Sequence, residues 1–161
     1  MTRRPQPPFE ELVREHGSSV LRVCRALVGP QDAADAWSET FLSALQAYPR
    51  LRAGSNVRGW LVTIAHRKAI DQVRGIARRR ESTVEMPEVA APEPAQADDE
   101  ELRSALEALP PKQRGAVVYR YLAGLSYPEV GKLLGSNATA ARRSAADGIA
   151  NLRKRLSKGT S

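Results

Sequence analysis

The 161-residue chain has one cysteine, Cys24, and two histidines, His16 and His66. A single cysteine allows no intramolecular disulfide and no cysteine-rich zinc site, and it fits a reducing compartment. The histidines lie far apart in the sequence and lack the spacing of metal ligands, so we expect both to be structural or surface residues. The sequence therefore predicts no metal site and no other cofactor.

Long apolar runs are also absent. No window approaches the roughly 18 consecutive apolar residues of a membrane-spanning helix. The arginines near the N-terminus precede prolines instead of an apolar stretch, which is unlike a signal peptide. We therefore predict a cytoplasmic protein without membrane insertion. Carboxylates cluster only in a proline-bearing stretch that cannot hold metal ligands rigidly, which disfavours an enzyme acting on nucleic acid.

Positive charge is plentiful, with a formal net charge of +7, and this favours a polyanionic partner. Residues 81–101 differ from the rest because they hold 8 of the 18 acidic residues, three prolines and no lysine or arginine. Such a segment cannot bury enough apolar surface to fold alone. We interpret residues 81–101 as a flexible acidic linker between two helical domains.

Apolar residues at helical spacing predict helices over residues 9–27, 32–47 and 57–80. Prolines block a helix in residues 1–8, which we expect to be a disordered arm, and Asp32 is a candidate N-cap. The long helix carries a polar and basic stripe opposite its apolar seam, at Thr63, Arg67, Arg74 and Arg78. Such a stripe fits a solvated face or nucleic-acid contact equally well.

Further helices are predicted over residues 102–109 and from Pro111 to Gly124, and no strand is predicted anywhere. The apolar side of the second of these helices is expected to contain Val117, Val118, Tyr121 and Leu122.

The last predicted element is a pair of helices over residues 126–156. Ser126 and Glu129 form a capping box, Gly135 supplies a left-handed turn, and Ser136 or Asn137 caps the second helix. Its apolar seam is Ala141, Ala145, Ile149, Leu152 and Leu156. Polar and basic residues early in the second helix fit a DNA-reading helix-turn-helix, and an ordinary helical hairpin is the alternative.

Three stretches, in this order, resemble bacterial sigma factors. Residues 32–42 resemble the segment that grips the RNA polymerase clamp. Residues 56–74 resemble the helix that melts the promoter and reads the minus-ten element. Residues 109–135 resemble the fourth sigma region. The chain lacks an intermediate domain, so over residues 9–156 it is similar to the extracytoplasmic-function (ECF) type of the sigma-70 family.

The resemblance implies an all-α fold, with a region 2 helical bundle at residues 9–80 and a region 4 helix-turn-helix domain at residues 102–158. It implies a protein without catalytic chemistry that directs promoter-specific initiation. The implied partners are core RNA polymerase, through its beta-prime clamp and beta flap, and promoter DNA. Whether an anti-sigma factor exists stays open. The acidic linker would thread the basic channel of the polymerase.

The resemblance also implies the residues of each interface. Core polymerase would contact Asp35, Ser38, Glu39 and Leu42. The minus-ten element would contact Asn56, Arg58, Thr63, Arg67, Arg74 and Arg78. The minus-thirty-five element would contact Thr139, Arg142, Arg143 and Ser144. Trp60 lies beside Leu61 and Ile64, which favours core packing over stacking on a base.

The recognition helix departs from the family pattern. The arginine usual in the family is Ser144 here, so we expect Arg142 or Arg143 to read a base. A later family arginine is Asp147, and Gly148 weakens the helix by about 1 kcal/mol relative to alanine. Ser38 stands where glutamine is usual. A free-standing helix-turn-helix regulator, and an interaction module that mimics a sigma factor, are the alternative interpretations.

Overall fold

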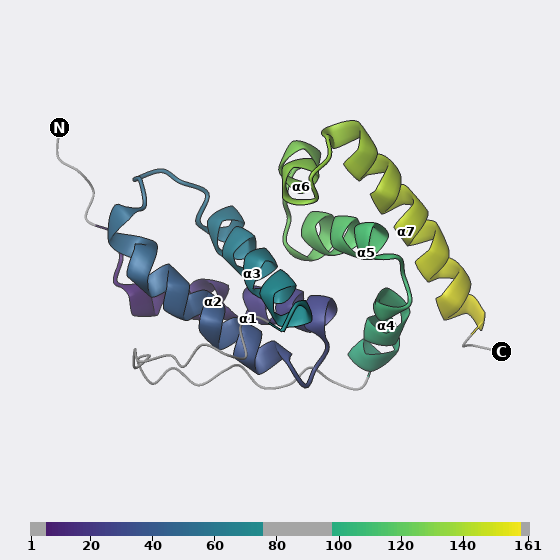
Figure 1. Ribbon diagram of the computed structural model, residues 1–161, viewed down its shortest axis with the longest axis horizontal. Helices are drawn as coiled ribbons and strands as arrows, with labels where there is room; N and C mark the ends of the chain where they lie inside the picture. Colours follow the sequence, from purple (N-terminus) through teal and green to yellow (C-terminus); the bar gives the residue numbers. More distant parts are fainter. Residues whose placement is uncertain (1–5, 76–97, 159–161) are drawn as a thin grey trace.

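A computed structural model describes residues 6–75 and 98–158, and all regular structure in these ranges is helical (Figure 1). The all-α prediction is confirmed. The N-terminal bundle consists of α1 (Phe9–Val28), α2 (Ala33–Ala47), a short 3₁₀ turn (Tyr48–Arg50) and α3 (Val57–Val73). The C-terminal bundle consists of α4 (Asp98–Glu107), α5 (Pro111–Val117), a π-helical turn (Val118–Leu122), α6 (Tyr127–Leu133) and α7 (Ala138–Lys158).

Aromatic side chains fill the core of the N-terminal bundle. Trp37 and Phe41 from α2 are at most 1% exposed, and their ring centroids lie 4.7 Å apart. The indole nitrogen of Trp37 donates a 2.9 Å hydrogen bond to the Gly17 carbonyl oxygen, so its one polar atom is satisfied inside the core. Leu61 and Ala65 bring α3 onto the same cluster. Because α2 is held by this inner face, its outer face remains available.

The segment before α1 is packed against the bundle. Gln6 Nε2 donates a 2.8 Å hydrogen bond to the Tyr48 carbonyl oxygen. The Tyr48 hydroxyl donates to the Pro7 carbonyl oxygen. The expectation of a disordered arm is therefore wrong for residues 6–8, because Tyr48 anchors them, and residues 1–5 lie outside the described residues.

The long helix is shorter than predicted, since α3 ends at Val73 instead of Arg80. Gly75 has φ of +71°, the left-handed conformation that often follows a helix C-terminus. Arg78 and most of the predicted linker lie outside the described residues. The linker prediction is wrong at its C-terminal end, because α4 begins at Asp98. Acidic residues such as Glu100 near the start of α4 favour a helix through the macrodipole.

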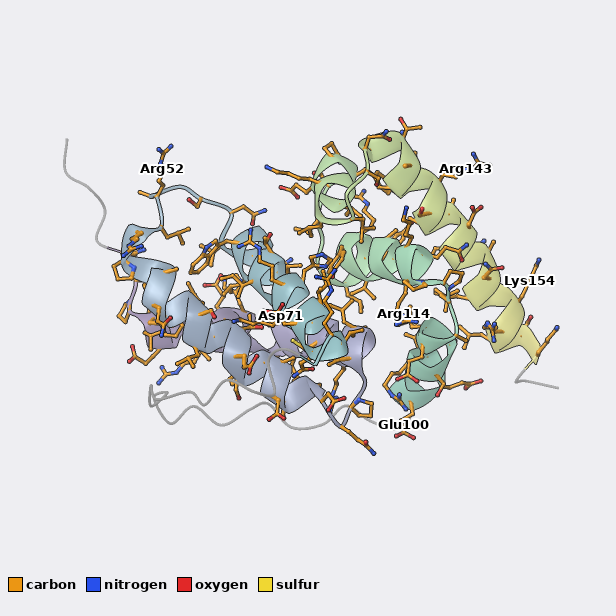
Figure 2. The ribbon with its side chains drawn as sticks, viewed as in Figure 1. Arg52, Asp71, Glu100, Arg114, Arg143 and Lys154 are labelled. Atoms are coloured by element: carbon orange, nitrogen blue, oxygen red, sulfur yellow. The ribbon has the colours of Figure 1, made fainter. Side chains whose placement is uncertain are left out.

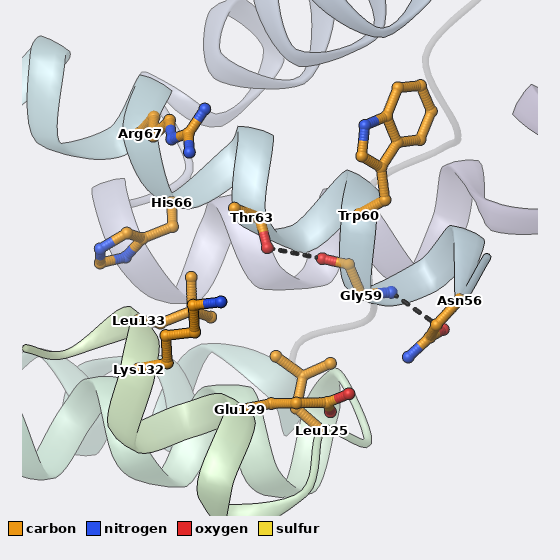
Figure 3. A pocket seen from close by; sticks show the side chains of 10 residues that line it. All are labelled: Asn56, Gly59, Trp60, Thr63, His66, Arg67, Leu125, Glu129, Lys132 and Leu133. Carbon is orange, nitrogen blue, oxygen red and sulfur yellow. Dashed lines mark hydrogen bonds between the residues drawn. The ribbon is translucent and has the colours of Figure 1, made fainter. Parts of the chain in front are cut away.

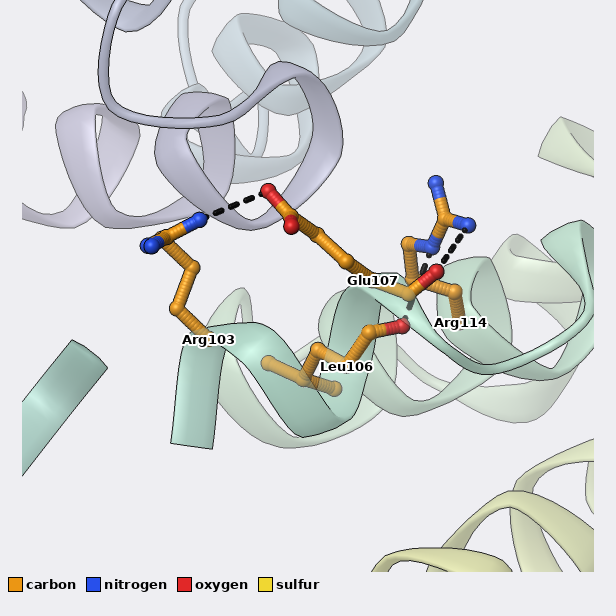
Figure 4. Close-up of polar contacts among 4 residues, drawn as sticks. All are labelled: Arg103, Leu106, Glu107 and Arg114. Atoms are coloured by element: carbon orange, nitrogen blue, oxygen red, sulfur yellow. Dashed lines mark hydrogen bonds and ion pairs between the residues drawn. The ribbon is translucent and has the colours of Figure 1, made fainter. Parts of the chain in front are cut away.

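Arg114 joins α4 to α5 (Figure 4). Its guanidinium donates to the carbonyl oxygens of Leu106, Glu107 and Leu109 at 3.1, 2.8 and 3.1 Å. Leu106 and Glu107 are the last residues of α4 and Leu109 lies just beyond it, so Arg114 caps the C-terminus of this helix together with the Leu109 amide, which also bonds the Leu106 carbonyl. The ion pair between Arg103 and Glu107, at 2.7 Å, lies on the surface of the same helix.

The helix after Pro111 contains a π-helical turn that the sequence did not reveal. The Ala123 amide bonds the Val118 carbonyl five residues earlier, at 3.0 Å. The wider turn rotates the following side chains, so Tyr119 is 1% exposed whereas Tyr121 is 58% exposed. The predicted apolar side is therefore correct at Val117 and Val118 and wrong at Tyr121 and Leu122.

The helix-turn-helix has the predicted caps. Ser126 and Glu129 form both hydrogen bonds of the capping box. Gly135 has φ of +69°, and Asn137 accepts a 2.8 Å hydrogen bond from the Ala140 amide at the start of α7. Ala141, Ala145 and Leu152 form the buried seam of α7, with Ile149 and Leu156 partly buried beside them.

The two bundles pack against each other. Val23, Ala26 and Val62 of the N-terminal bundle belong to the same apolar cluster as Tyr119 and Leu125 of the C-terminal bundle. Figure 1 shows α3 facing α5 and α6, whereas α7 lies on the far side of the C-terminal bundle. The described part of the chain therefore has a compact arrangement in which one face of α3 is covered.

Candidate polymerase and nucleic-acid interfaces

The outer face of α2 carries the residues predicted to bind core polymerase. Asp35 and Ser38 are exposed, and Glu39 and Leu42 are half-buried. The opposite face is fixed in the core by Trp37 and Phe41, so a rigid helix presents two carboxylates beside a leucine. Such a surface suits a partner that has a basic rim around an apolar patch.

Two of the residues predicted to contact the minus-ten element also shape α3. Asn56 is the N-cap, and its side-chain oxygen accepts a 3.2 Å hydrogen bond from the Gly59 amide. The Thr63 hydroxyl donates to the Gly59 carbonyl oxygen at 2.8 Å. Arg58, Arg67 and Arg74 are exposed. Asn56 and Thr63 are thus held in place by the backbone, while the arginines are available to phosphates.

A groove of about 490 Å³ separates α3 from α6 and the loop before it (Figure 3). Residues of both bundles line it, including Asn56, Thr63, Arg67, Leu125, Glu129 and Lys132. The structure therefore brings three of the predicted minus-ten contacts together on one wall, opposite the C-terminal bundle. Trp60 is partly buried in the N-terminal core and also lines this groove, which agrees with the predicted core packing.

His66 links the two bundles, a role that no local sequence signal indicated. Its Nδ1 lies 2.5 Å from the Tyr119 hydroxyl oxygen. Burial raises the pKa of Tyr119, so its hydroxyl keeps its proton and can donate to the ring nitrogen when that nitrogen is unprotonated. Burial also lowers the pKa of His66, opposed by a hydrogen bond with the Leu133 backbone and assisted by the nearby Arg67. Burial therefore favours the neutral form of His66 in this contact.

The lowered pKa of His66 predicts that acid weakens the contact between the two bundles. The pKa of His66 in the packed state lies below its usual value of 6.5. The stabilising contribution is therefore fully present above pH 6.5 and is lost as pH falls through the lowered pKa. Small-angle scattering between pH 7.5 and roughly 5 should show expansion of the wild type. His66→Gln should flatten this pH dependence. If the variant expands with falling pH like the wild type, other titrating groups cause the expansion.

The residues predicted to read the minus-thirty-five element all lie in the first two turns of α7. Thr139, Arg142 and Arg143 are exposed and Ser144 is half-buried. Arg143 projects from the outer side of the helix (Figure 2). The Arg142 guanidinium instead lies over the ring of Tyr127, with its carbon 5.0 Å from the ring centroid. Sequence reasoning missed Tyr127, because only the packing of α6 against α7 brings it to Arg142.

Catalytic chemistry has little support among the described residues. Residues 6–75 and 98–158 contain no group of three or more histidine, cysteine, aspartate or glutamate side chains arranged to hold a metal ion. Cys24 is buried, and burial raises the pKa of its thiol to about 12, so it is not a nucleophile at neutral pH. Within the same ranges no helix is both long and apolar enough to cross a membrane.

The described residues thus combine a helix-turn-helix in the C-terminal bundle with an exposed acidic helix face in the N-terminal bundle. Residues 12–80 match Sigma-70 region 2, and residues 99–152 match Sigma-70, region 4. The chain belongs to the ECF sigma factors of the sigma-70 family, which direct transcription initiation and are not enzymes.

Two curated relatives are similar over most of this chain. The sigma factor SigE of Mycolicibacterium smegmatis is 34% identical over 96% of this chain, which spans 64% of the length of SigE. CarQ of Myxococcus xanthus is 33% identical over 94% of this chain and 90% of CarQ. The fold also matches the sigma factor RpoE from Bartonella quintana, solved with the anti-sigma factor NepR, with a TM-score of 0.75 at 22% identity, covering 92% of this chain and 96% of RpoE.

Proposed function

We propose that this chain binds core RNA polymerase through α2 and reads promoters with both bundles. The N-terminal bundle reads the minus-ten element through α3, and the C-terminal bundle reads the minus-thirty-five element through α7. The observation that carries this proposal is the order of the exposed surfaces. The acidic face of α2, the basic α3 and the arginines of α7 follow one another in a chain that covers most of CarQ.

The acidic face of α2 is the proposed anchor on the polymerase. Asp35 and Glu39 are four residues apart, so their carboxylates lie on adjacent turns of one helix face. Charge complementarity there would orient the encounter and exclude partners of the wrong sign. The polymerase works in the cytoplasm, so the proposal places this protein there too.

The chain should read DNA poorly when it is free. Bases extruded from the minus-ten element need a pocket and a basic track for their backbone. Asn56, Thr63 and Arg67 would supply these, yet they line the groove against Glu129 and Lys132 of the other bundle. Under this proposal only the holoenzyme binds promoters specifically, whereas a free-standing regulator would bind them without core polymerase.

RpoE is bound to an anti-sigma factor, and we propose that a partner of this class also regulates this chain.

Transcription with purified core polymerase tests the proposed function. The wild-type chain should direct initiation at discrete start sites. Asp35→Lys combined with Glu39→Lys should weaken core binding roughly tenfold or more, because interfacial charge pairs become repulsive. Circular dichroism should be unchanged, since both side chains lie outside the core.

Glu10→Lys combined with Glu15→Lys is the matched control, because these two exposed carboxylates lie on α1, away from the proposed anchor. This double variant carries the same change of charge and should bind core polymerase like the wild type. Unchanged core affinity in the α2 variant would contradict the proposed role of α2. Sequence-specific duplex binding by the chain alone would instead favour the free-standing regulator.

A further inference from the structure

Two arginines share the ring of Tyr127, the first residue of α6. The guanidinium carbons of Arg120 and Arg142 lie 4.6 and 5.0 Å from the ring centroid. Both distances are within the roughly 6 Å limit of a cation–π interaction. Arg120 precedes the helix-turn-helix, whereas Arg142 lies on its recognition helix. Tyr127 therefore connects the recognition helix to the segment before it.

Tyr127 and Arg120 are held by the body of the bundle. Tyr127 is half-buried and packs against the apolar cluster. Arg120 Nη1 donates a 3.0 Å hydrogen bond to the Leu125 carbonyl oxygen. Arg142 is exposed. The ring is therefore the fixed partner, and Arg142 is the side chain whose direction the interaction can set.

We infer that Tyr127 is a positioning residue for promoter reading, which fixes Arg142 as the base-reading arginine of α7. This inference rests on the proposed function of the C-terminal bundle. A guanidinium stacked on a ring uses its flat face, and its N–H donors lie at the edge. These donors stay available for a bidentate contact with guanine. Stacking also reduces the side-chain entropy that Arg142 would lose on binding DNA.

Arg143 has a different place on the same helix. It is exposed and projects from the outer side of α7 (Figure 2). A flexible arginine of this kind suits a phosphate, which gives affinity without sequence preference. The two neighbouring arginines should therefore differ in kind, with Arg142 setting the preference and Arg143 adding salt-dependent affinity.

Holoenzyme assembled with core polymerase should be tested against a library of minus-thirty-five elements at several salt concentrations. Tyr127→Leu should relax the preference at the same base position as Arg142→Ala, by roughly two- to fivefold. Tyr127→Phe keeps the ring and should retain the wild-type preference. The double variant Tyr127→Leu with Arg142→Ala should be no worse than Arg142→Ala alone. Arg143→Ala should weaken all sequences alike and flatten the salt dependence.

Other results would overturn the inference. Equal weakening of all sequences by Tyr127→Leu would mean that the residue only supports the fold, as would additive effects in the double variant. Tyr127→Met, a second apolar replacement, carries the same expectation if the leucine variant melts early. A wild-type holoenzyme that shows no preference in this element would refute the proposed function itself. A wild-type preference that Tyr127→Leu leaves unchanged would refute only the positioning role.

Discussion

Gly131→Ala is expected to abolish initiation that depends on the minus-thirty-five element while leaving core binding through α2 intact. Gly131 is buried in α6, and a Cβ there would lie 2.5 Å from the carbonyl carbon and 2.6 Å from the carbonyl oxygen of Asn137. These are backbone atoms of the residue that caps α7, so they cannot rotate aside. The turn would have to open, which would displace the recognition helix. Overpacking of this kind costs about 1–3 kcal/mol or more.

Two glycines of the same bundle are controls for Gly131→Ala. A Cβ at Gly115 would approach Leu134 Cδ2 at 2.9 Å, but that atom ends a flexible side chain. Gly135 has open space around it and φ of +69°, so alanine there costs only about 1 kcal/mol of backbone strain. Thermal unfolding and promoter-specific transcription should rank Gly131→Ala as the most damaging. Wild-type transcription by Gly131→Ala would show that the turn tolerates an alternative path.

Val62→Asp is expected to separate the two bundles. Val62 is 1% exposed and belongs to the cluster that also contains Tyr119 and Leu125. An unpaired carboxylate at this position costs several kcal/mol while the bundles stay together, and the cost falls away when they part. The N-terminal bundle should remain folded, because its own core uses Leu61 and Ala65, which belong to a separate apolar cluster.

Scattering should show a larger radius of gyration for Val62→Asp, and hydrogen exchange should increase around Tyr119. Binding of single-stranded minus-ten DNA should also increase, because the groove wall formed by Asn56, Thr63 and Arg67 would no longer face the C-terminal bundle. Val73→Asp is the matched control, since Val73 is 80% exposed near the end of the same helix. If Val62→Asp unfolds the N-terminal bundle by circular dichroism, or keeps the wild-type dimensions, the expected separation is wrong.

Local chemistry made the helix-turn-helix predictable. The capping box of Ser126 and Glu129 and the left-handed Gly135 act within a few residues, so their effect can be inferred from the sequence. The π-helical turn could not be inferred in this way, because one additional residue in a turn leaves the apolar composition unchanged. The additional residue in the π-helical turn explains why Tyr119, and not the predicted Tyr121, lies in the core.

The structural role of Gly148 could not be predicted from its helix propensity. From the sequence alone it only weakens α7. In the fold it allows α7 to approach α5, because a Cβ would lie 2.6 Å from Val117 Cγ2 and 3.2 Å from the Gln113 carbonyl oxygen. The pairs Tyr127–Arg142 and His66–Tyr119 were likewise unpredictable, since each joins residues of different helices. The outer residues of α2 and α7 could be placed by periodicity alone.

The covered face of α3 has a quantitative consequence for promoter occupancy. If only the open form binds the minus-ten strand, the observed affinity equals the intrinsic affinity multiplied by the open fraction. Each further 1.4 kcal/mol or so in favour of the packed form would lower that affinity about tenfold. A mutation, a proton or a partner acting at His66 or Val62 would then adjust transcription in proportion, without touching any residue proposed to contact DNA. Selection could thus set the basal output of the promoter through the strength of an apolar contact remote from the base pairs.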